Sequence, residues 1–343
     1  MRGHGDLDQL EMADVPTPEL VAPHDVLVRL SAAALNHLDL WTLAGLPGLS
    51  LAMPHILGGD GAGVVERVGP AVRNLRPGDR VLVNPGIWCG QCSWCQSGEQ
   101  SLCDTYRILG EHLPGTLAEY IVVPDVNLAR VPDIDPPLSW AEAAAFSLVT
   151  LTAWRMLMTR AALKAGETVL VWGVGGGVGT AALQIAKAAG AQVIVTSSSD
   201  AKLDRARALG ADAVINYRTA EVSKEVRKLT QRRGADVVVD NVGEATWEQS
   251  LRALARRGRL VTCGATTGPH VVTDVRRLFW HQYTIMGSTM GNADEFTAIL
   301  TALGAGKLRP VVDRVFPLSE AVDAVRRLQG ADHMGKIVVE PGR

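Results

Sequence analysis

A glycine-rich loop between a strand and a helix is the feature of this 343-residue chain that most limits its fold. An apolar, β-branched run at residues 168–172 leads directly into the sequence GVGGGVG at residues 173–179. A helix-forming segment then continues through Ala188. Glycines let a backbone approach a pyrophosphate closely, and the helix that follows offers free N–H groups and a positive dipole end. In this setting the loop predicts a dinucleotide site.

The register of the loop departs from the common G-x-G-x-x-G pattern. Counting back from Gly179, the last two glycines of the pattern are Gly179 and Gly176, but the first position is Val174. A merely flexible turn is the alternative interpretation. The strand before the loop and the helix after it favour the dinucleotide site.

Strands and helices alternate around this loop. We expect a helix at residues 201–209 and further apolar strands at residues 193–196, 214–215, 236–240, 259–262 and 284–287. Apolar strands separated by helices are typical of a parallel sheet that is covered on both faces. The sequence therefore predicts an α/β fold with a doubly wound, Rossmann-type domain over residues 133–294. Ser139 and Glu142 form a capping-box pattern at the start of its first helix.

The two ends of the chain have a different character. Short β-branched runs occur at residues 26–30, 63–68, 80–83, 120–123, 311–315 and 336–339, with a helix at 319–328. We expect residues 1–132 and 295–343 to form a second, mostly-β domain.

Four cysteines, Cys89, Cys92, Cys95 and Cys103, follow a C-x2-C-x2-C-x7-C spacing inside a lobule near residues 86–106. Four thiolates at this spacing suit one tetrahedral zinc with no open position, which is a structural site. Two disulfides and four unrelated thiols are the alternatives. No secretory signal opens the chain, and a reducing cytoplasm favours zinc. Cys263 stands alone and is expected to be a small buried hydrophobe.

Charge and hydropathy exclude two classes of partner. The 34 basic and 36 acidic residues give a net charge of −2, so no overall field attracts nucleic acid or an anionic membrane. Apolar stretches end well before the roughly 20 residues of a membrane span. We expect a cytoplasmic protein that acts on a small molecule.

The end of the second Rossmann strand indicates the choice between NAD and NADP. An acid usually pairs there with the ribose 2′-hydroxyl of NAD. This chain has three serines at residues 197–199, with Asp200 a few residues late and Lys202 close by. Hydroxyls tolerate a 2′-phosphate and Lys202 can neutralise it, so we expect NADP(H) to be preferred over NAD(H). Asp200 is expected to be the N-cap of the next helix.

A zinc lobule inside a mostly-β half, followed by a dinucleotide fold, resembles the medium-chain dehydrogenase/reductase superfamily. The sequences GGDGAGVVERVG at residues 58–69, PGDRV at 77–81 and GTLAEY at 115–120 look like its landmarks. The resemblance implies a GroES-like catalytic domain, an active site in a cleft and a homodimer joined through Rossmann sheet edges. Family members begin with a strand before the segment at residues 4–10, so that edge strand is expected to be missing or the start misassigned.

The departures from the zinc alcohol dehydrogenases of this superfamily concern the catalytic metal. Their cysteine ligand and relay hydroxyl correspond to Asn36 and Leu38, and their histidine ligand corresponds to Gly59. The region of the third ligand reads FSLV at residues 146–149. Asparagine is a poor zinc ligand, and glycine, leucine and valine are none. A catalytic zinc would need new ligands, for example His37, Asp60 and His112.

The remaining pattern resembles the zinc-free quinone oxidoreductases, which have matches to Asn36 and Asp60, and to Tyr217 beside the 2′-phosphate. The resemblance implies hydride transfer from NADPH to a quinone or to the β-carbon of an enone. A zinc-dependent alcohol dehydrogenase or carbonyl reductase with non-standard ligands, and a non-catalytic NADPH-binding relative, are the alternatives.

Candidate site residues follow from these patterns. Asn36 is expected to donate a hydrogen bond to a substrate carbonyl, His37 to shuttle a proton, and Asp60 to hold the loop and Asn36 in place. The alternatives are a turn-capping asparagine and a plain surface histidine. For Trp41 and Trp280 we expect core packing rather than a wall beside a flat substrate. The expected cofactor-binding residues are Thr152, Gly175, Gly176, Gly177, Val178, Gly179, Ser197, Ser198, Lys202, Tyr217, Asn241, Gly264, Ala265, Gly287, Ser288 and Thr289.

Overall fold

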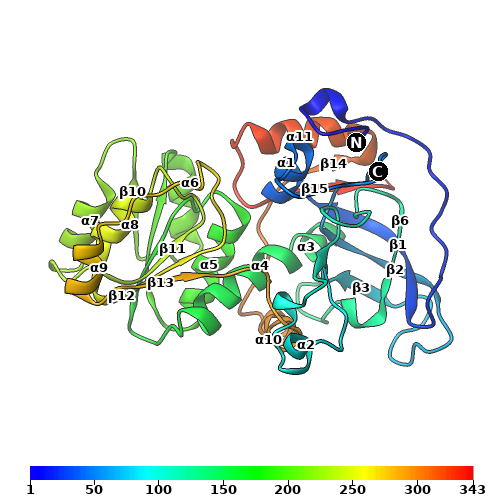
Figure 1. Cartoon of the computed structure of the whole chain (residues 1–343), viewed down its shortest axis with the longest axis horizontal. Coiled ribbons are helices and arrows are strands. Elements are labelled where there is room, and N and C mark those ends of the chain that lie inside the picture. The colour runs from blue at the N-terminus through cyan, green and yellow to red at the C-terminus, as the bar shows by residue number, and fades with distance from the viewer. Residues whose placement is uncertain (343) are drawn as a thin grey trace. The chain divides into compact units, whose positions relative to one another are not determined.

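The computed structural model describes residues 1–342, and the chain divides into two compact units (Figure 1). The first comprises Met1–Leu148 and Asn292–Arg343, and the second comprises Val149–Gly291. The mostly-β unit is thus built from both ends of the chain.

The first unit is organised around a seven-stranded sheet. Its order is β14-β15-β1-β2-β3-β7, and β6 also pairs with β1. The strands are β1 (Asp25–Ala34), β2 (Asp60–Val68), β3 (Arg80–Val83), β6 (Tyr120–Pro124), β7 (Leu128–Arg130), β14 (Val312–Pro317) and β15 (Lys336–Glu340). Val26, Val28 and Val65 belong to its buried core. The antiparallel pairing of β1 with β15 joins segments that lie some 300 residues apart, with Ala34 opposite Val338.

Short helices and turns surround this sheet. They are η1 (Leu7–Gln9), α1 (His37–Ala44), α2 (Ser93–Gln96), η2 (Gln100–Leu102), η3 (Asp125–Asn127), α3 (Trp140–Ala144), α10 (Ala293–Gly304), η5 (Leu318–Glu320) and α11 (Ala321–Gln329). The small strands β4 (Gly86–Ile87) and β5 (Arg107–Ile108) pair with each other. In the described residues before β1 the chain forms η1 and no strand.

The helix predicted to begin at Ser139 is α3. Ser139 Oγ accepts a hydrogen bond from the main-chain N–H of Glu142 at 3.2 Å, and the Glu142 carboxylate accepts from the main-chain N–H of Ser139 at 2.9 Å. The sequence assigned residues 133–148 to the Rossmann domain, but they lie with the first unit, because α3 packs against β1 and β2.

The second unit contains a six-stranded parallel sheet in the order β10-β9-β8-β11-β12-β13 (Figure 1). Its strands are β8 (Thr168–Val171), β9 (Gln192–Ser197), β10 (Ala213–Asn216), β11 (Ala235–Asp240), β12 (Leu254–Thr262) and β13 (Thr284–Gly287). Its helices are α5 (Gly177–Ala188), α6 (Asp200–Ala208), α7 (Val222–Leu229), α8 (Trp247–Ala253) and α9 (Val275–His281). The helix α4 (Ser147–Trp154) continues into a π-helical turn, η4 (Arg155–Arg160). The predicted Rossmann sheet is confirmed.

Several local expectations were wrong. Trp280 is 74% exposed and therefore not in the core, while Trp41 is half-buried. Cys263 follows the end of β12 and is half-buried. The N-cap of α6 is Ser199, whose Oγ accepts from the N–H of Lys202, and Asp200 is the first helical residue.

No helix within residues 1–342 combines the length and the apolar character that a membrane span needs.

Candidate functional site

Asn36 lies where β1 ends and α1 begins. It is the N-cap of α1, and its main-chain N–H donates to Oδ2 of Asp39 at 2.7 Å. The other Asp39 oxygen accepts from the N–H of Gly58 at 2.8 Å. Burial of the carboxyl, opposed by these two hydrogen bonds, raises the pKa of Asp39 to about 6. Asp39 thus ties the loop of Asn36 to the loop that precedes β2.

Asp60, the first residue of β2, has no exposed surface. Its Oδ1 accepts from the main-chain N–H of Leu148 at 2.7 Å, and its Oδ2 accepts from Nδ2 of Asn36 at 3.0 Å. The ammonium of Lys336 lies 2.8 Å from the same Oδ2. The expectation that Asp60 holds Asn36 in place agrees with these contacts.

Lys336 is a residue that the sequence reasoning missed. It opens β15, is 4% exposed, and donates to Oδ1 of Asn36 as well as to Asp60. The signal in the sequence is a lysine at the head of an apolar strand, because a charged residue is rarely buried unless it is paired. The side chains of Asn36, Asp60 and Lys336 are called the buried polar triad below.

The triad fixes the orientation of the Asn36 amide. Its oxygen faces the Lys336 ammonium and its nitrogen faces the Asp60 carboxylate, so a flipped amide would set like partners against each other. The second amide hydrogen goes to the carbonyl of Ala34 at 3.3 Å, which is a long bond. Of the two N–H groups of this amide, the one bonded to Ala34 can more easily exchange its acceptor for another oxygen.

The surroundings of the triad do not fit a catalytic metal. A Cβ placed on Gly59 would lie 3.1 Å from Cδ1 of Leu148, so a leucine side chain fills the space beside the position of the family's histidine ligand. Within residues 1–342, the four cysteines are the one set of potential ligands gathered closely enough for a metal ion. His37, Asp60 and His112 are therefore not assembled as a rebuilt zinc site.

His37 is the first residue of α1, with an exposed side chain whose ring meets Trp41 edge-on at 5.0 Å. Partial desolvation lowers the pKa of His37 below its usual 6.5. The imidazole is therefore mostly neutral at pH 7 and becomes a proton donor only in acid.

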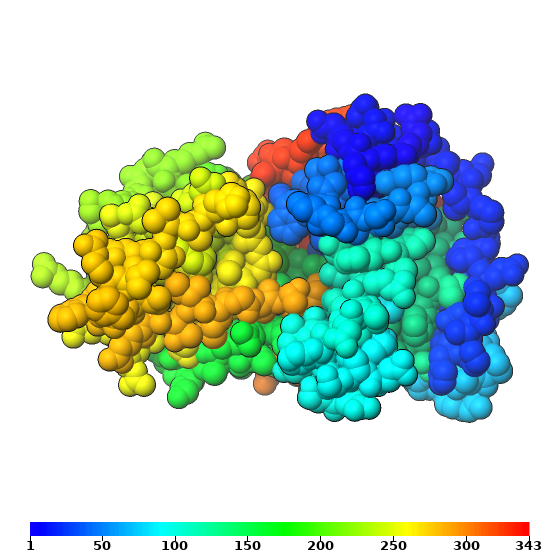
Figure 2. All heavy atoms as spheres, in the orientation of Figure 1, coloured from blue at the N-terminus to red at the C-terminus, as the bar shows by residue number. Residues whose placement is uncertain are grey.

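The cysteine lobule fits a tetrahedral metal. The sulfur atoms of Cys89, Cys92, Cys95 and Cys103 all lie within 4.8 Å of one another. The Cys89 and Cys95 sulfurs are 3.9 Å apart, close to the ~3.8 Å that four zinc–sulfur bonds of about 2.3 Å require, and far from a disulfide bond. Main-chain N–H groups of Asp104 and Cys95 lower the pKa of Cys92, which favours its thiolate. Figure 2 shows the lobule, in cyan, at the surface of its unit.

The glycine loop of the second unit has the expected geometry. Helix α5 begins at Gly177 with Gly176 as its N-cap, so the cap has no side chain to occupy the first N–H groups. A Cβ on Gly179 would lie 2.5 Å from the carbonyl oxygen of Gly173, so only glycine allows this packing. Gly173 itself has a φ of +65°. Gly175 and Val178 lie in the same loop and first turn.

The ends of β9 and β10 bring Ser197 and Tyr217 together. The main-chain N–H of Tyr217 donates to the carbonyl of Ser197 at 3.1 Å. Ser197 Oγ accepts from the N–H of Ser199 at 3.2 Å, which leaves the hydroxyl hydrogen for a ligand. Asp200 accepts from the side chain of Asn216 at 2.8 Å. Ser198 and Lys202 are half-buried beside them.

Among residues 1–342, three residues that follow strands at the carboxyl edge of this sheet each have a buried polar atom without a hydrogen-bond partner. The atoms are Nε1 of Trp172 after β8, Oδ1 of Asn241 after β11 and Oγ of Ser288 after β13. Such orphaned atoms fit a bound polar ligand, because burial without a partner is costly. Gly264 and Ala265 follow β12, while Gly287 and Thr289 flank Ser288. Thr152, on α4, is buried, and its hydroxyl lies 3.9 Å from the sulfur of Met290.

Asp240 at the end of β11 is a second residue that the sequence reasoning missed. Its buried carboxylate accepts from Ser250 Oγ at 2.6 Å and from Thr246 Oγ1 at 2.9 Å, and also from the N–H groups of Val242 and Gly243. It therefore fixes the loop that carries Asn241.

Charge is unevenly distributed along the chain. Between Val149 and Gly291 the sequence has 19 Lys and Arg residues but 11 Asp and Glu residues. The near-neutral balance of the whole chain therefore hides a basic second unit and an acidic first unit, and a basic unit attracts anionic ligands.

Comparison with known proteins agrees with this architecture. The family described as "Alcohol dehydrogenase GroES-like domain" matches residues 22–133, and "Zinc-binding dehydrogenase" matches residues 177–305. An NAD-dependent alcohol dehydrogenase of Sulfurisphaera tokodaii is 34% identical over 97% of this chain and 96% of its own length.

Two solved structures are similar over almost the whole chain. A crystal structure of an NAD-dependent alcohol dehydrogenase is 46% identical, with a TM-score of 0.94 over 99% of this chain and 98% of its own. The 2-octenoyl-CoA carboxylase reductase CinF, in complex with NADP and 2-octenoyl-CoA, is 33% identical, with a TM-score of 0.88 over 97% and 82%.

Proposed function

Because the chain belongs to the medium-chain dehydrogenase/reductase superfamily, with its zinc-containing alcohol dehydrogenase-like members, and is an NAD(P)-dependent oxidoreductase, we propose that it reduces quinones or activated alkenes with NADPH. In this proposal one zinc stabilises the cysteine lobule, and no metal takes part in the reaction. The protein would be cytoplasmic, since four thiolates need a reducing compartment.

The buried polar triad is the observation that carries the proposal. An ammonium bonded to Asp60 and Asn36 supplies a fixed positive charge close to the position where relatives have a metal ligand. The ammonium occupies an oxygen of Asp60 and the oxygen of Asn36 that would otherwise be the ligand atoms here, and the neighbouring Gly59 and Leu148 side chains offer none. A substrate that needs strong Lewis-acid help, such as a simple alcohol, is therefore disfavoured.

A conjugated acceptor fits the groups that are present. Hydride added to the β-carbon of an enone moves negative charge onto the carbonyl oxygen, where a hydrogen bond stabilises it. Asn36 is proposed to give that bond with the amide hydrogen that now meets Ala34. Water or His37 supplies the final proton in this proposal, and the lowered pKa of His37 favours water near pH 7.

The names of relatives differ in how well they support the two parts of the proposal, the conjugated acceptor and the use of NADPH. CinF was solved with NADP and with 2-octenoyl-CoA, whose alkene is conjugated to a carbonyl group. Several other relatives are named NAD-dependent alcohol dehydrogenases. The choice of NADPH for this chain rests instead on Ser197, Lys202 and Tyr217, and on the basic charge of the second unit.

A homodimer through the edge of the Rossmann sheet is also proposed. β13 is an edge strand, and apolar side chains in the segment that leads into it are exposed: Val272 at 90%, Phe279 at 64% and Trp280 at 74%. Figure 2 shows the gold-to-orange segment that carries them at the surface of the second unit. A second copy that pairs with β13 would cover them.

The proposal is tested by measuring zinc content together with a substrate screen. We expect about one zinc per chain, and oxidation of NADPH by quinones or enones that exceeds oxidation by aldehydes. Two zincs per chain with NAD-linked oxidation of ethanol or benzyl alcohol would establish the alcohol dehydrogenase alternative. Stoichiometric NADPH binding without turnover of any acceptor would establish the non-catalytic one.

A further inference from the structure

A shallow hollow of about 580 Å³, open to solvent and called the cavity below, lies on the second unit and is lined mainly by cations. They come from α7, α8, α9 and the turn after α7, and are Lys224, Arg227, Lys228, Arg232, Arg252 and Arg277. The acid in the lining is Glu221. None of these residues belongs to the dinucleotide loop or to the zinc lobule.

The cavity lies at the opposite edge of the sheet from the dinucleotide loop. The glycine loop follows the carboxyl end of β8. Arg232 lies in the turn that enters β11, and Arg252 lies in the last turn of α8, which enters β12. Because β8, β11 and β12 are parallel, their amino ends share the other edge. A ligand in this cavity would not occupy the cofactor's place.

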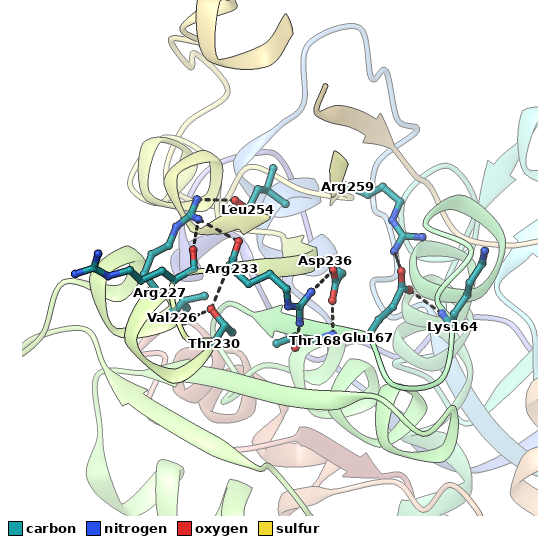
Figure 3. Close-up of polar contacts among 12 residues, drawn as sticks. Lys164, Glu167, Thr168, Val226, Arg227, Thr230, Arg233, Asp236, Leu254 and Arg259 are labelled. Carbon is teal, nitrogen blue, oxygen red and sulfur yellow. Dashed lines mark hydrogen bonds and ion pairs between the residues drawn. The ribbon is translucent and has the colours of Figure 1, made fainter. Parts of the chain in front are cut away.

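Arg227 forms a rigid part of the cavity wall. Its guanidinium donates to the main-chain carbonyls of Arg252 and Leu254, the latter at 2.7 Å, and to those of Arg232 and Arg233 (Figure 3). These bonds neutralise none of its charge, since all the acceptors are carbonyl oxygens. They hold a fixed positive charge and connect the ends of two helices.

Only some of the cations that line the cavity form ion pairs with acids. Lys224 pairs with Glu221 at 2.6 Å, and Lys228 and Arg252 pair with Glu225 and Glu248. Within residues 1–342, no such acid faces Arg277, whose Nε is buried without a hydrogen-bond partner. The Arg232 side chain likewise has no ion pair there. Three of the six cations are therefore uncompensated.

Helix dipoles do not account for the whole cluster. Cations in the last turn of a helix are stabilised by its dipole, which explains Arg227, Lys228 and Arg252. Arg277 lies in the first turn of α9, where the dipole disfavours a cation, although the carboxylate of the N-cap Asp274 lies in the same turn. The dipole of α9 therefore does not explain the position of Arg277.

The pKa of the nearby His281 is affected by the same positive charges. Burial, together with the charges of Arg277, Arg256 and Arg227, lowers the pKa of His281. An anion that entered the cavity would offset those charges and raise the pKa of His281 again.

From this geometry we propose that the cavity is a second anion site, which binds a small ligand with several linked phosphate groups. The volume suits a ligand of that size. The lining contains no aromatic or large apolar side chain on which a base could stack, so the contacts are made to phosphate oxygens. Several cations spread over three helices match linked phosphates better than one isolated ion.

Calorimetric titration of inorganic tripolyphosphate into the full chain saturated with NADPH tests the site. We expect one binding site per chain without release of NADPH, and binding at least tenfold weaker for orthophosphate. The double variant Arg232→Gln/Arg277→Gln should weaken tripolyphosphate binding tenfold or more. Lys164→Gln, which removes an exposed cation of the same unit outside the cavity, should leave it unchanged.

Proton NMR of His281 locates the binding. The pKa of His281 should rise when tripolyphosphate is added to the parent protein and stay constant in the double variant. Displacement of NADPH, an equal loss of affinity in Lys164→Gln, orthophosphate binding as tight as tripolyphosphate, or an unmoved His281 pKa would each overturn the proposal. Because the cofactor site stays filled throughout, failure here leaves the proposed reductase activity untouched.

Discussion

Lys336 Nζ lies 2.8 Å from Oδ2 of Asp60, and both side chains are almost completely buried. Removing one partner of such a pair leaves an uncompensated charge in the interior, which typically costs about 3–5 kcal/mol. We therefore expect Lys336→Met to lower the free energy of unfolding by that amount in urea titrations, and to lower kcat by releasing Asn36.

The double variant Asp60→Asn/Lys336→Met provides the control for this prediction. It removes both charges, so it should be more stable than Lys336→Met alone. If the double variant lost as much stability as Asp60→Asn and Lys336→Met lose separately and added together, Asp60 and Lys336 would not be coupled. The role given to the triad would then be wrong.

Zinc content tests whether the cysteine lobule holds the one metal ion that we expect per chain. Elemental analysis should give about one zinc per chain, and Cys92→Ser should lose it together with about 2 kcal/mol or more of stability, because ordering the lobule depends on metal binding. Cys263→Ser is the matched control and should keep the metal. Zinc retained in Cys92→Ser would contradict the assignment.

Cofactor preference depends on the end of β9. NADPH should bind the parent protein more tightly than NADH, and Ser197→Asp should weaken NADPH binding by about tenfold or more through repulsion of the 2′-phosphate. Ser199→Ala removes a helix-capping hydroxyl but adds no charge, so it should keep the preference. Fluorescence titration with both cofactors measures the two affinities. If the parent protein bound NADH as tightly as NADPH, the predicted preference for NADP(H) would be wrong.

Asp39 should make stability depend on pH. Its pKa of about 6 in the folded protein is above the ordinary 3.8, so the folded state holds the proton more tightly. The resulting stabilisation is complete below pH 3.8 and is lost as the pH rises through 6, a change of up to about 3 kcal/mol. Unfolding measured from pH 4 to 7 should show a smaller decline for Asp39→Asn. The exposed Asp133→Asn should decline like the parent.

The exposed apolar residues in the segment that leads into β13 predict the oligomeric state. Light scattering at micromolar concentration should show a dimer, and Phe279→Asp/Trp280→Asp should convert it to a monomer by placing charges in the interface. Val21→Asp changes an even more exposed apolar residue in the first unit and should leave the dimer intact. A monomeric parent protein would rule out this interface.

Most of the fold could be predicted because its elements have strong local signals. The glycine loop before α5 and the capping box of α3 depend on neighbours in the sequence, and both lie where expected. The cysteine spacing likewise brings four sulfurs together within one short segment.

The parts that were missed depend on contacts between distant segments. Lys336 meets Asp60 across 276 residues, and no local pattern in the last strand names its partner. From the sequence, Asp240 is only the polar last residue of a predicted strand. In the structure its carboxylate accepts hydrogen bonds from the hydroxyls of Thr246 and Ser250. Trp280 was expected in the core because tryptophan is usually buried, but it lies on the exposed face of α9, which packs against β12.

The sheet of the first unit also sets an order of events during synthesis. β1 and β2 are made early, but β15, which pairs with β1 and carries Lys336, is made only after the whole second unit. Until then Asp60 has no counter-ion, so burying its carboxylate would be unfavourable. Until β15 is made, the first unit therefore lacks a strand that pairs with β1 and the cation that pairs with Asp60, whereas all six strands of the Rossmann sheet are already present.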